Sequence, residues 1–292
     1  MTGDPRPDGG VTTIVEAPVE QGRLANVADI RTIAGIEYRL AVRNRWALAL
    51  TAVFAAFALG LITFSGASVG PDGFDRIVAS LAVLAVYLVP LGALAFGYDA
   101  IVGAEDNGWL QALFALPIRR WRVAIGTYLG RAIALVAAIA IGFGIAGGML
   151  IAEFGLAEWS TYTVFMLGAI ALGLSFLAIA LVLSSLAREK THALGGALVV
   201  WAWFVLVHDL LALGVIAAFR LSDAAVAALV LSNPAGVFRI LVLGMLGAGG
   251  DAGFATVMSA AGLSYPVLVA AMIAWIVIPL IVAGVLIQRR RL

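Results

Sequence analysis

Residues Trp159–Ala187 read WSTYTVFMLGAIALGLSFLAIALVLSSLA, a run of twenty-nine residues without a single charged side chain. A helix that crosses the apolar core of a bilayer needs about 20 mostly apolar residues. The run therefore predicts a membrane-spanning helix, bounded by Glu158 and Arg188. The whole chain agrees, because 63% of its residues are hydrophobic and only 12% are charged, against about 25% charge in an ordinary soluble domain.

Five further apolar windows resemble this one, and only the fifth span carries ionisable residues near its middle. The six predicted spans lie at about 47–65, 77–98, 130–152, 160–187, 193–219 and 266–287. We therefore expect an all-α, polytopic membrane protein with one transmembrane domain over residues 28–292. Residues 1–27 lack helical periodicity and are expected to form a disordered tail. They also lack the basic start and apolar middle of a signal peptide.

Arginine and lysine indicate which side of the membrane each loop faces, because cytoplasmic loops carry an excess of them. The tail, the 99–131 loop, the 188–192 loop and the C-terminal residues together hold fifteen of the eighteen basic residues. The opposite side holds three, against six acids. We expect both termini to be cytoplasmic in a multi-pass protein of the plasma (inner) membrane. The net charge of only +1 gives no reason to expect nucleic acid as a partner.

Two segments outside the spans are predicted to be helical. Residues Asp29–Trp46 mix apolar positions with arginines, which predicts a basic amphipathic helix in the membrane interface; a simple extension of the first span is the alternative. The outer segment 220–265 is expected to form one or two short helices, with Ser232 or Asn233 capping the second one before Pro234. Its apolar character leaves re-entry into the bilayer open.

A polar island, Tyr98–Arg122, interrupts the apolar chain between the second and third spans. It reads YDAIVGAEDNGWLQALFALPIRRWR, with an acidic cluster followed by a short apolar stretch, Pro117 and three arginines. A plain cytoplasmic loop explains the arginines but not the acids or the apolar stretch. We therefore favour a cytoplasmic coupling helix that binds a nucleotide-binding subunit, with Trp109, Leu110 and Leu113 filling a groove. The residues expected to make this contact are Asp99, Gly103, Glu105, Asp106, Gly108, Trp109, Leu113 and Pro117.

Two smaller polar groups are further candidate sites. His208 and Asp209 lie inside the fifth span, where ionisable residues indicate function by default because burying them is costly. Adjacent residues project about 100° apart on a helix, so we expect them to face different neighbours. A proton role, one metal ligand from His208, or a hydrogen-bonded pair that fixes helix packing all stay open. A second cytoplasmic contact is expected at Arg188, Lys190 and His192, with a solvated turn as the alternative.

Other residue types exclude chemistry or predict packing. The chain has no cysteine, which excludes disulfides and thiolate metal sites. Its methionines are scattered, so core packing explains them better than a copper(I) path. Small residues let membrane helices approach closely, and this is the role expected for Gly142, Gly144, Gly147, Gly148 and the pair Gly195–Gly196. No P-loop sequence (Gly-x-x-x-x-Gly-Lys-Ser/Thr) occurs, so ATP would have to be hydrolysed by another subunit.

The run Tyr98–Gly103, its acidic glycine-containing turn and the later Leu116-Pro117 resemble the permease subunits of ABC exporters of the two-gene type. Further stretches narrow the resemblance to the permeases that serve copper-site maturation of nitrous oxide reductase. These stretches are Arg43–Trp46, Ser184–Lys190, Trp201 to Leu210, Asn233-Pro234, Phe238-Arg239 and Arg289–Arg291. The resemblance begins near Asp29, and the chain departs from it in its tail and in having His208 directly before Asp209.

This resemblance implies a homodimer with several partners in addition to membrane lipid. Each copy would bind a cytoplasmic ABC ATPase through residues 99–117, and that subunit would hold the ATP and Mg²⁺. An extracytoplasmic, solenoid-like copper-processing protein would bind the outer face. Copper would be handled by the partners, and this chain would hold no cofactor and catalyse no reaction.

Two other functions remain open from the sequence. One is an ABC exporter permease for another cargo, such as a lipid, a peptide or a drug, which would have the same fold. The other is an intramembrane enzyme or ion-coupled carrier that uses His208 and Asp209. Such proteins normally converge several polar residues from different spans, and here the other spans hold almost none.

Overall fold

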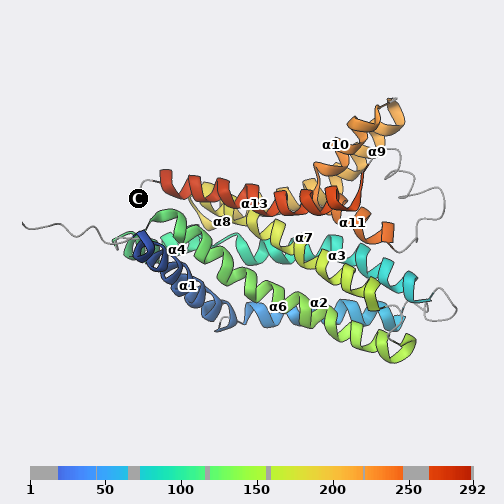
Figure 1. Ribbon diagram of the computed structural model, residues 1–292, viewed down its shortest axis with the longest axis horizontal. Coiled ribbons are helices and arrows are strands. Elements are labelled where there is room, and N and C mark those ends of the chain that lie inside the picture. Colours follow the sequence, from blue (N-terminus) through green and yellow to red (C-terminus); the bar gives the residue numbers. More distant parts are fainter. Residues whose placement is uncertain are drawn as a thin grey trace, which may run out of the picture.

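The computed structural model describes residues 19–43, 45–64, 73–115, 119–155, 159–219, 221–245 and 263–290. Within them the chain is a bundle of helices with no β-strand (Figure 1). The long helices are α1 Val19–Arg43, α2 Trp46–Phe64, α3 Gly73–Gly97, α6 Arg120–Phe154, α7 Trp159–Leu186 and α13 Tyr265–Arg289. The shorter elements are α4 Val102–Asp106, α5 Trp109–Phe114, α8 Lys190–Ala202, the π-helical turn η1 Trp203–Val207, α9 His208–Ala218, α10 Asp223–Leu231 and α11 Pro234–Met245.

Six helices of the described residues are long and apolar enough to cross a membrane, which confirms the predicted number. They are α2, α3 with its continuation to Asp106, α6, α7, the run α8–η1–α9 and α13. α10 and α11 would add a seventh span if they formed one broken segment, since they pass the same test together but are bent by 107°. Re-entry of this pair into the bilayer therefore stays open.

α6 begins about ten residues before the predicted start of the third span. Arg131 was counted with the predicted loop 99–131, but it lies inside the helix with its charge paired to two acids. At about 1.5 Å per residue, the 35 residues of α6 span roughly 52 Å, well beyond an apolar core of about 30 Å. α6 therefore projects past the membrane at the end that carries Arg131.

The core lies where α3, α6 and α7 meet. Val89, Leu135, Ile139, Leu172 and Phe176 are almost completely buried there.

Two of the predicted close approaches between helices at glycine residues are confirmed. A side chain at Gly142 would meet Phe54 of α2, and one at Gly147 would meet the ring of Tyr162. Gly144, Gly148 and Gly195 have no atom within 4 Å of such a side chain and Gly196 has only ordinary contact, so for these four the prediction is wrong within one chain.

α1 starts earlier than the sequence suggested. Residues 19–27, expected as part of a disordered tail, continue the helix toward the N-terminus, because Glu20, Gln21, Arg23 and Leu24 all favour helix. Residues 1–18 lie outside the described residues. α1 ends at Arg43, and Arg45 adopts a left-handed conformation (φ 58°) that separates α1 from α2.

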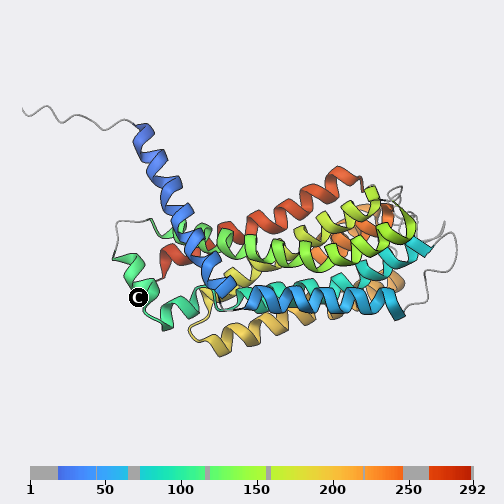
Figure 2. The same ribbon diagram turned by 90° about the horizontal axis from the view of Figure 1, so that it is seen from below.

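α1 crosses one end of α6 at a steep angle, and its first turns stand clear of the bundle (Figure 2). The crossing is close because Gly126 and Gly130 of α6 lie against Ile33 and Ala34. A side chain at Gly130 would come within 2.5 Å of the carbonyl oxygen of Ala34. The position of α1 in the membrane interface stays a prediction.

The described part of the outer segment, residues 221–245, forms two helices, as expected. Ser222 caps α10 by accepting a hydrogen bond from the Ala225 N–H. The Asn233 side chain caps α11 by accepting one from the Ala235 N–H at 2.9 Å, with Pro234 as the first helical residue. α11 is buried against the bundle, whereas α10 has no buried residue. Residues 246–262 of this segment lie outside the described residues.

Candidate functional site

The polar island folds as two short helices at the end of the bundle where the C-terminus lies, here called the basic end. α4 and α5 are joined at Asn107 and Gly108, and Gly108 has φ 72°, a left-handed conformation that favours glycine. Ser184 of α7 holds the start of α4, because its hydroxyl accepts the N–H groups of Ile101 (2.9 Å) and Val102 (3.1 Å). These N–H groups would otherwise have no intrahelical partner.

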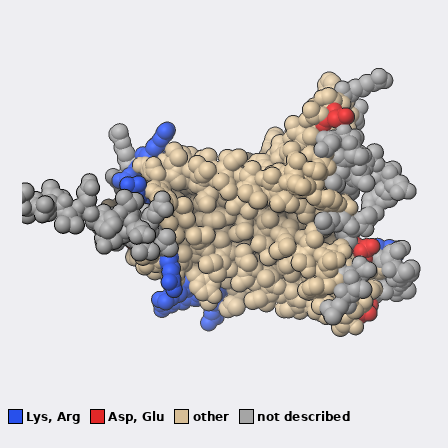
Figure 3. Space-filling model, in the orientation of Figure 1, with Lys and Arg blue, Asp and Glu red and all other residues tan. Residues whose placement is uncertain are grey.

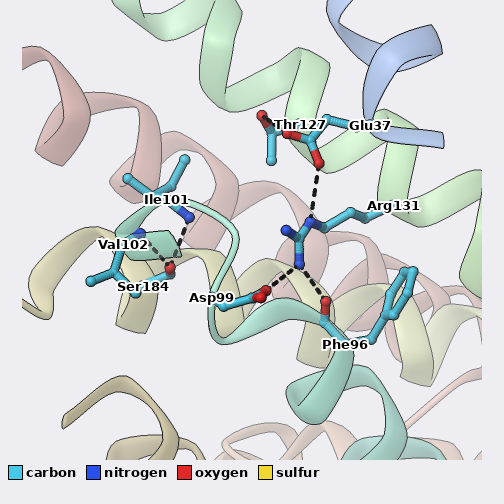
Figure 4. A network of polar contacts seen from close by, with 8 residues as sticks. All are labelled: Glu37, Phe96, Asp99, Ile101, Val102, Thr127, Arg131 and Ser184. Carbon is cyan, nitrogen blue, oxygen red and sulfur yellow. Dashed lines mark hydrogen bonds and ion pairs between the residues drawn. The ribbon is translucent and has the colours of Figure 1, made fainter. Parts of the chain in front are cut away.

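Arg131 is the first charged brace of the island (Figure 4). Its Nη1 donates to Asp99 Oδ1 at 2.7 Å and to the Phe96 carbonyl at 2.6 Å, where α3 ends. Its Nε faces Glu37 Oε2 of α1 at 3.4 Å. One guanidinium thus connects α1, the end of α3 and α6, three elements that are far apart in sequence.

Glu37 is the most deeply buried acid of this group, with 6% of its surface exposed. Burial raises the pKa of its carboxyl, and the Arg131 charge opposes this rise. The Asp99 carboxylate, whose side chain is 41% exposed, adds to the rise. Arg131 therefore balances two acids that differ sharply in their access to water.

Arg290 is the second charged brace. Its guanidinium pairs with Glu105 of α4 and donates to the carbonyls of Ser185 (2.9 Å) and Ala187 (2.8 Å) at the end of α7. Its own carbonyl accepts from Arg120 Nη1 at the start of α6. A cation at the C-terminal end of a helix is stabilised by the unpaired carbonyls there, so Arg290 joins the island to α6, α7 and α13.

The 188–192 loop, the second one predicted to be cytoplasmic, reaches the island through Lys190. Lys190 Nζ lies 3.5 Å from Asp106 Oδ2, and its stem packs beside Gly103. Arg188 and His192 are exposed, and His192 Nδ1 lies 3.9 Å from Glu189 on its own loop. Of these three predicted contact residues, only Lys190 joins the island in this structure.

The outward face of the island is small and mixed in character. Leu110 and Leu113 are buried against the chain's own core, so they hold α5 in place and do not fill a partner's groove as the sequence suggested. Spacing explains this, because positions i and i+3 share one face of a helix. Pro117 lies outside the described residues. The exposed residues, here called the docking face, are Asp106, Asn107, Gly108, Trp109, Gln111, Ala112 and Ala115.

A cleft of about 270 Å³ opens beside the docking face, between α1 and the island. Glu37, Asp99, Arg131 and Lys190 supply its charged lining, and Trp46 is among its aromatic residues. The charges in the lining are largely paired with one another.

The second predicted polar site lies at the far end, the end opposite the basic end. Asn233 Nδ2 lies 3.2 Å from His208 Nδ1, 3.3 Å from Asp209 Oδ1 and 2.8 Å from the Phe204 carbonyl. The expectation that His208 and Asp209 face different neighbours is therefore wrong. The Asn233 amide lies between the two side chains, which directly follow the π-helical turn η1.

Two more residues complete this cluster. Arg239 of α11 pairs with Asp209 Oδ2 at 2.7 Å, and His208 Nε2 lies 2.9 Å from the Ser232 hydroxyl. The sequence indicated Asn233 as a candidate helix cap and Arg239 only through the family resemblance, and nothing in their spacing indicated this contact. The cluster ties α9 to α11, which fits a structural role. Among the described residues, no three His, Cys, Asp or Glu side chains are placed to hold a metal ion.

On one face of the molecule, basic and acidic side chains are concentrated at opposite ends. On the face drawn in Figure 3, most Lys and Arg side chains gather at the basic end, whereas the acids visible there lie at the far end. The described residues thus form an apolar bundle with six candidate membrane spans and a charged, braced island at its basic end.

Comparison with known proteins identifies the class. Residues 31–292 match the model of the ABC-2 family of transporter proteins, and the chain belongs to that family. It is 38% identical over 269 residues to a Stutzerimonas stutzeri protein named "Probable ABC transporter permease protein NosY", covering 88% of this chain and 97% of the relative. A Pseudomonas aeruginosa protein of the same name is 37% identical over 268 residues, covering 89% and 98%. The chain is thus a NosY-like ABC transporter permease subunit.

Proposed function

We propose that this permease couples ATP hydrolysis by a partner ATPase to a step on the outer side of the membrane, in the copper-site maturation of nitrous oxide reductase. The docking face is the observation that carries the proposal. It presents exposed Trp109 and Asp106 on a short segment that Arg131 and Arg290 brace against the ends of the spans. Movement of a segment held in this way displaces the helices to which it is bound, whereas movement of an unattached loop would not.

The basic end is the cytoplasmic end in this proposal. The excess of arginine there follows the pattern of cytoplasmic loops, and it places the docking face where an ATPase can reach it. The far end then faces the extracytoplasmic protein, and exposed α10 is the surface that we assign to this partner.

The permease acts as a homodimer in this proposal. The span α8–η1–α9 is the candidate interface, because only 6% of its apolar window is buried within the chain, against 50% to 61% for α3, α6 and α7. Leu194, Leu198 and Trp203 lie exposed along it. Cross-linking of the purified permease in lipid vesicles should give a dimer, and a permease that stays monomeric while it still supports maturation would contradict this arrangement.

Co-purification tests the coupling role. We expect the wild-type chain to retain its partner ATPase, and Trp109→Ala to lose it. Trp159→Ala is the matched control, because Trp159 is exposed to a similar degree (41% against 38%) but begins α7 at the far end. Retention of the ATPase by Trp109→Ala would contradict the docking face, and a wild-type chain that binds no ATPase would contradict the function.

The copper role needs its own measurement. Cells that carry the Trp109→Ala variant should produce nitrous oxide reductase with little copper, while cells with the Trp159→Ala control should fill it normally. A reductase with full copper in the absence of the permease would favour another cargo.

A further inference from the structure

α13 is the helix that reaches both polar clusters of the molecule. At the basic end it leads into Arg290, which pairs with Glu105 of the island. Toward the far end, the indole N–H of Trp275 donates to the Leu231 carbonyl at 3.0 Å, where α10 ends. About fifteen residues separate Arg290 from Trp275, a distance of roughly 22 Å along a helix.

Trp275 lies at the bend that joins the far-end elements. Its ring packs edge-on against Phe204 of η1, with 5.4 Å between ring centres. The Phe204 carbonyl is also an acceptor of Asn233, the residue that connects His208, Asp209 and the start of α11. A displacement of Trp275 therefore acts on the bend between α10 and α11 and on η1 together.

Arg290 is suited to the opposite end of this path. Its side chain is only 12% exposed and is held by Glu105 and by carbonyls of α7. Charge-assisted hydrogen bonds from a planar guanidinium resist both stretching and rotation. A movement of α4 is thus passed to the ends of α7 and α13, whereas Arg131 passes it to α1 and α6.

We propose that α13 transmits movement of the coupling island to the far-end bend, with Arg290 and Trp275 as positioning residues at its two ends. This inference rests on the proposed function, because the movement originates in a bound ATPase. Coupling between distant sites requires a continuous element with defined contacts at both ends. α13 is one helix from Tyr265 to Arg289, with Pro279 inside it, and it has such contacts at both ends.

The absence of cysteine from the chain allows a direct test. A single Ala228→Cys substitution on exposed α10 reports the far end through its rate of labelling by a membrane-impermeant maleimide. The permease is measured with its ATPase in lipid vesicles, both nucleotide-free and trapped with ATP and vanadate. We expect the labelling rate to change on trapping, and Arg290→Gln or Trp275→Phe to reduce that change about fivefold or more, as for typical coupling energies.

Trp275→Phe is the decisive variant, because it keeps an aromatic ring beside Phe204 and removes the N–H that donates to Leu231, together with the smaller ring of the indole. Trp201→Phe is its matched control, since it also removes one indole hydrogen bond, to the Tyr87 carbonyl, but on α8. Trp275→Phe should retain ATPase binding and hydrolysis, and Trp201→Phe should retain the full change in labelling. If Arg290→Gln fails to assemble, Trp275→Phe alone decides.

Several results would overturn the inference. The first is a change in labelling rate in Trp275→Phe as large as in wild type, and the second is a loss of that change in Trp201→Phe as large as in Trp275→Phe. The third is a pair of losses that multiply in the Arg290→Gln/Trp275→Phe double variant, since residues on one path should not act independently. No change at Ala228→Cys in a complex that binds and hydrolyses ATP would also overturn it. A chain that binds no ATPase would instead contradict the proposed function.

Discussion

Arg131 pairs with two acids, Glu37 and Asp99. The difference in exposure between these acids determines how much stability is lost when Arg131 is replaced. Arg131→Gln leaves the buried Glu37 carboxylate without a cation, which is costly, while the more exposed Asp99 recovers water. We expect a loss of about 2–3 kcal/mol in the free energy of unfolding, below the value for a fully buried pair because Asp99 is partly solvated. Unfolding in mixed detergent micelles measures it, and the Glu37→Gln/Arg131→Gln double variant should recover part of the loss.

Glu37 also predicts a pH dependence of stability. Its pKa is raised in the folded state, so the folded chain binds this proton more tightly than the unfolded chain. The stability that this group contributes is present below the unfolded-state pKa, near 4.5, and is lost as pH rises through the raised folded-state value. Melting temperatures measured across this range should fall more steeply for wild type than for Glu37→Gln, and equal slopes would contradict the assignment.

His208 separates a structural role from a catalytic one. Among the described residues it contacts Ser232, Asn233 and its neighbour Asp209, and no other acid. We expect His208→Ala to lower stability by about 1–2 kcal/mol, the cost of broken hydrogen bonds, and to keep copper maturation. A variant that stays folded but loses maturation completely would show that His208 moves protons or metal.

At the scale of elements, the contact between α1 and α6 depends on two glycines. Gly130→Ala would place a methyl group against the Ala34 backbone, which cannot move aside as a side chain can. We expect this variant to destabilise the protein by about 1–3 kcal/mol, the usual cost of overpacking. Gly144→Ala on the same helix is the control, because it meets open space and should be neutral or stabilising. Limited proteolysis measures how far α1 is released from α6. Equal cleavage rates in the two variants would contradict the contact between α1 and α6.

The same elements show what the sequence can and cannot predict. The six spans follow from charge-free windows, because a bilayer imposes a length and a composition on each crossing segment. The spacing Gly126-x-x-x-Gly130 was a readable signal for a helix contact, and it was missed beside the more obvious glycines at 142–148. The Arg290–Glu105 and Asn233–His208 contacts could not be predicted, since they join residues far apart along the chain and depend on how the helices pack.

At the scale of the molecule, the two ends differ in how firmly they are built. Arg131 and Arg290 tie the island to five long helices, which are α1, α3, α6, α7 and α13. In contrast, α10 has no buried residue and packs against the core through partly buried side chains such as Val226 and Val230. A firmly held island and a less firmly held α10 suit the proposed transmission of movement from the island to the far end. The reason is that elements that move in such transitions come from the less stable part of a fold.

The central claim is that the docking face binds the ATPase, and protection of one residue tests it most directly. In the cysteine-free chain, Ala112→Cys lies on the docking face and Ala224→Cys lies exposed on α10 at the far end. Maleimide labelling of each is measured in detergent with and without the partner ATPase. The account predicts that the ATPase slows labelling of Ala112→Cys about tenfold or more, a coupling of about 1.4 kcal/mol or more, and leaves Ala224→Cys unchanged. Equal labelling of Ala112→Cys with and without a bound ATPase would contradict the account.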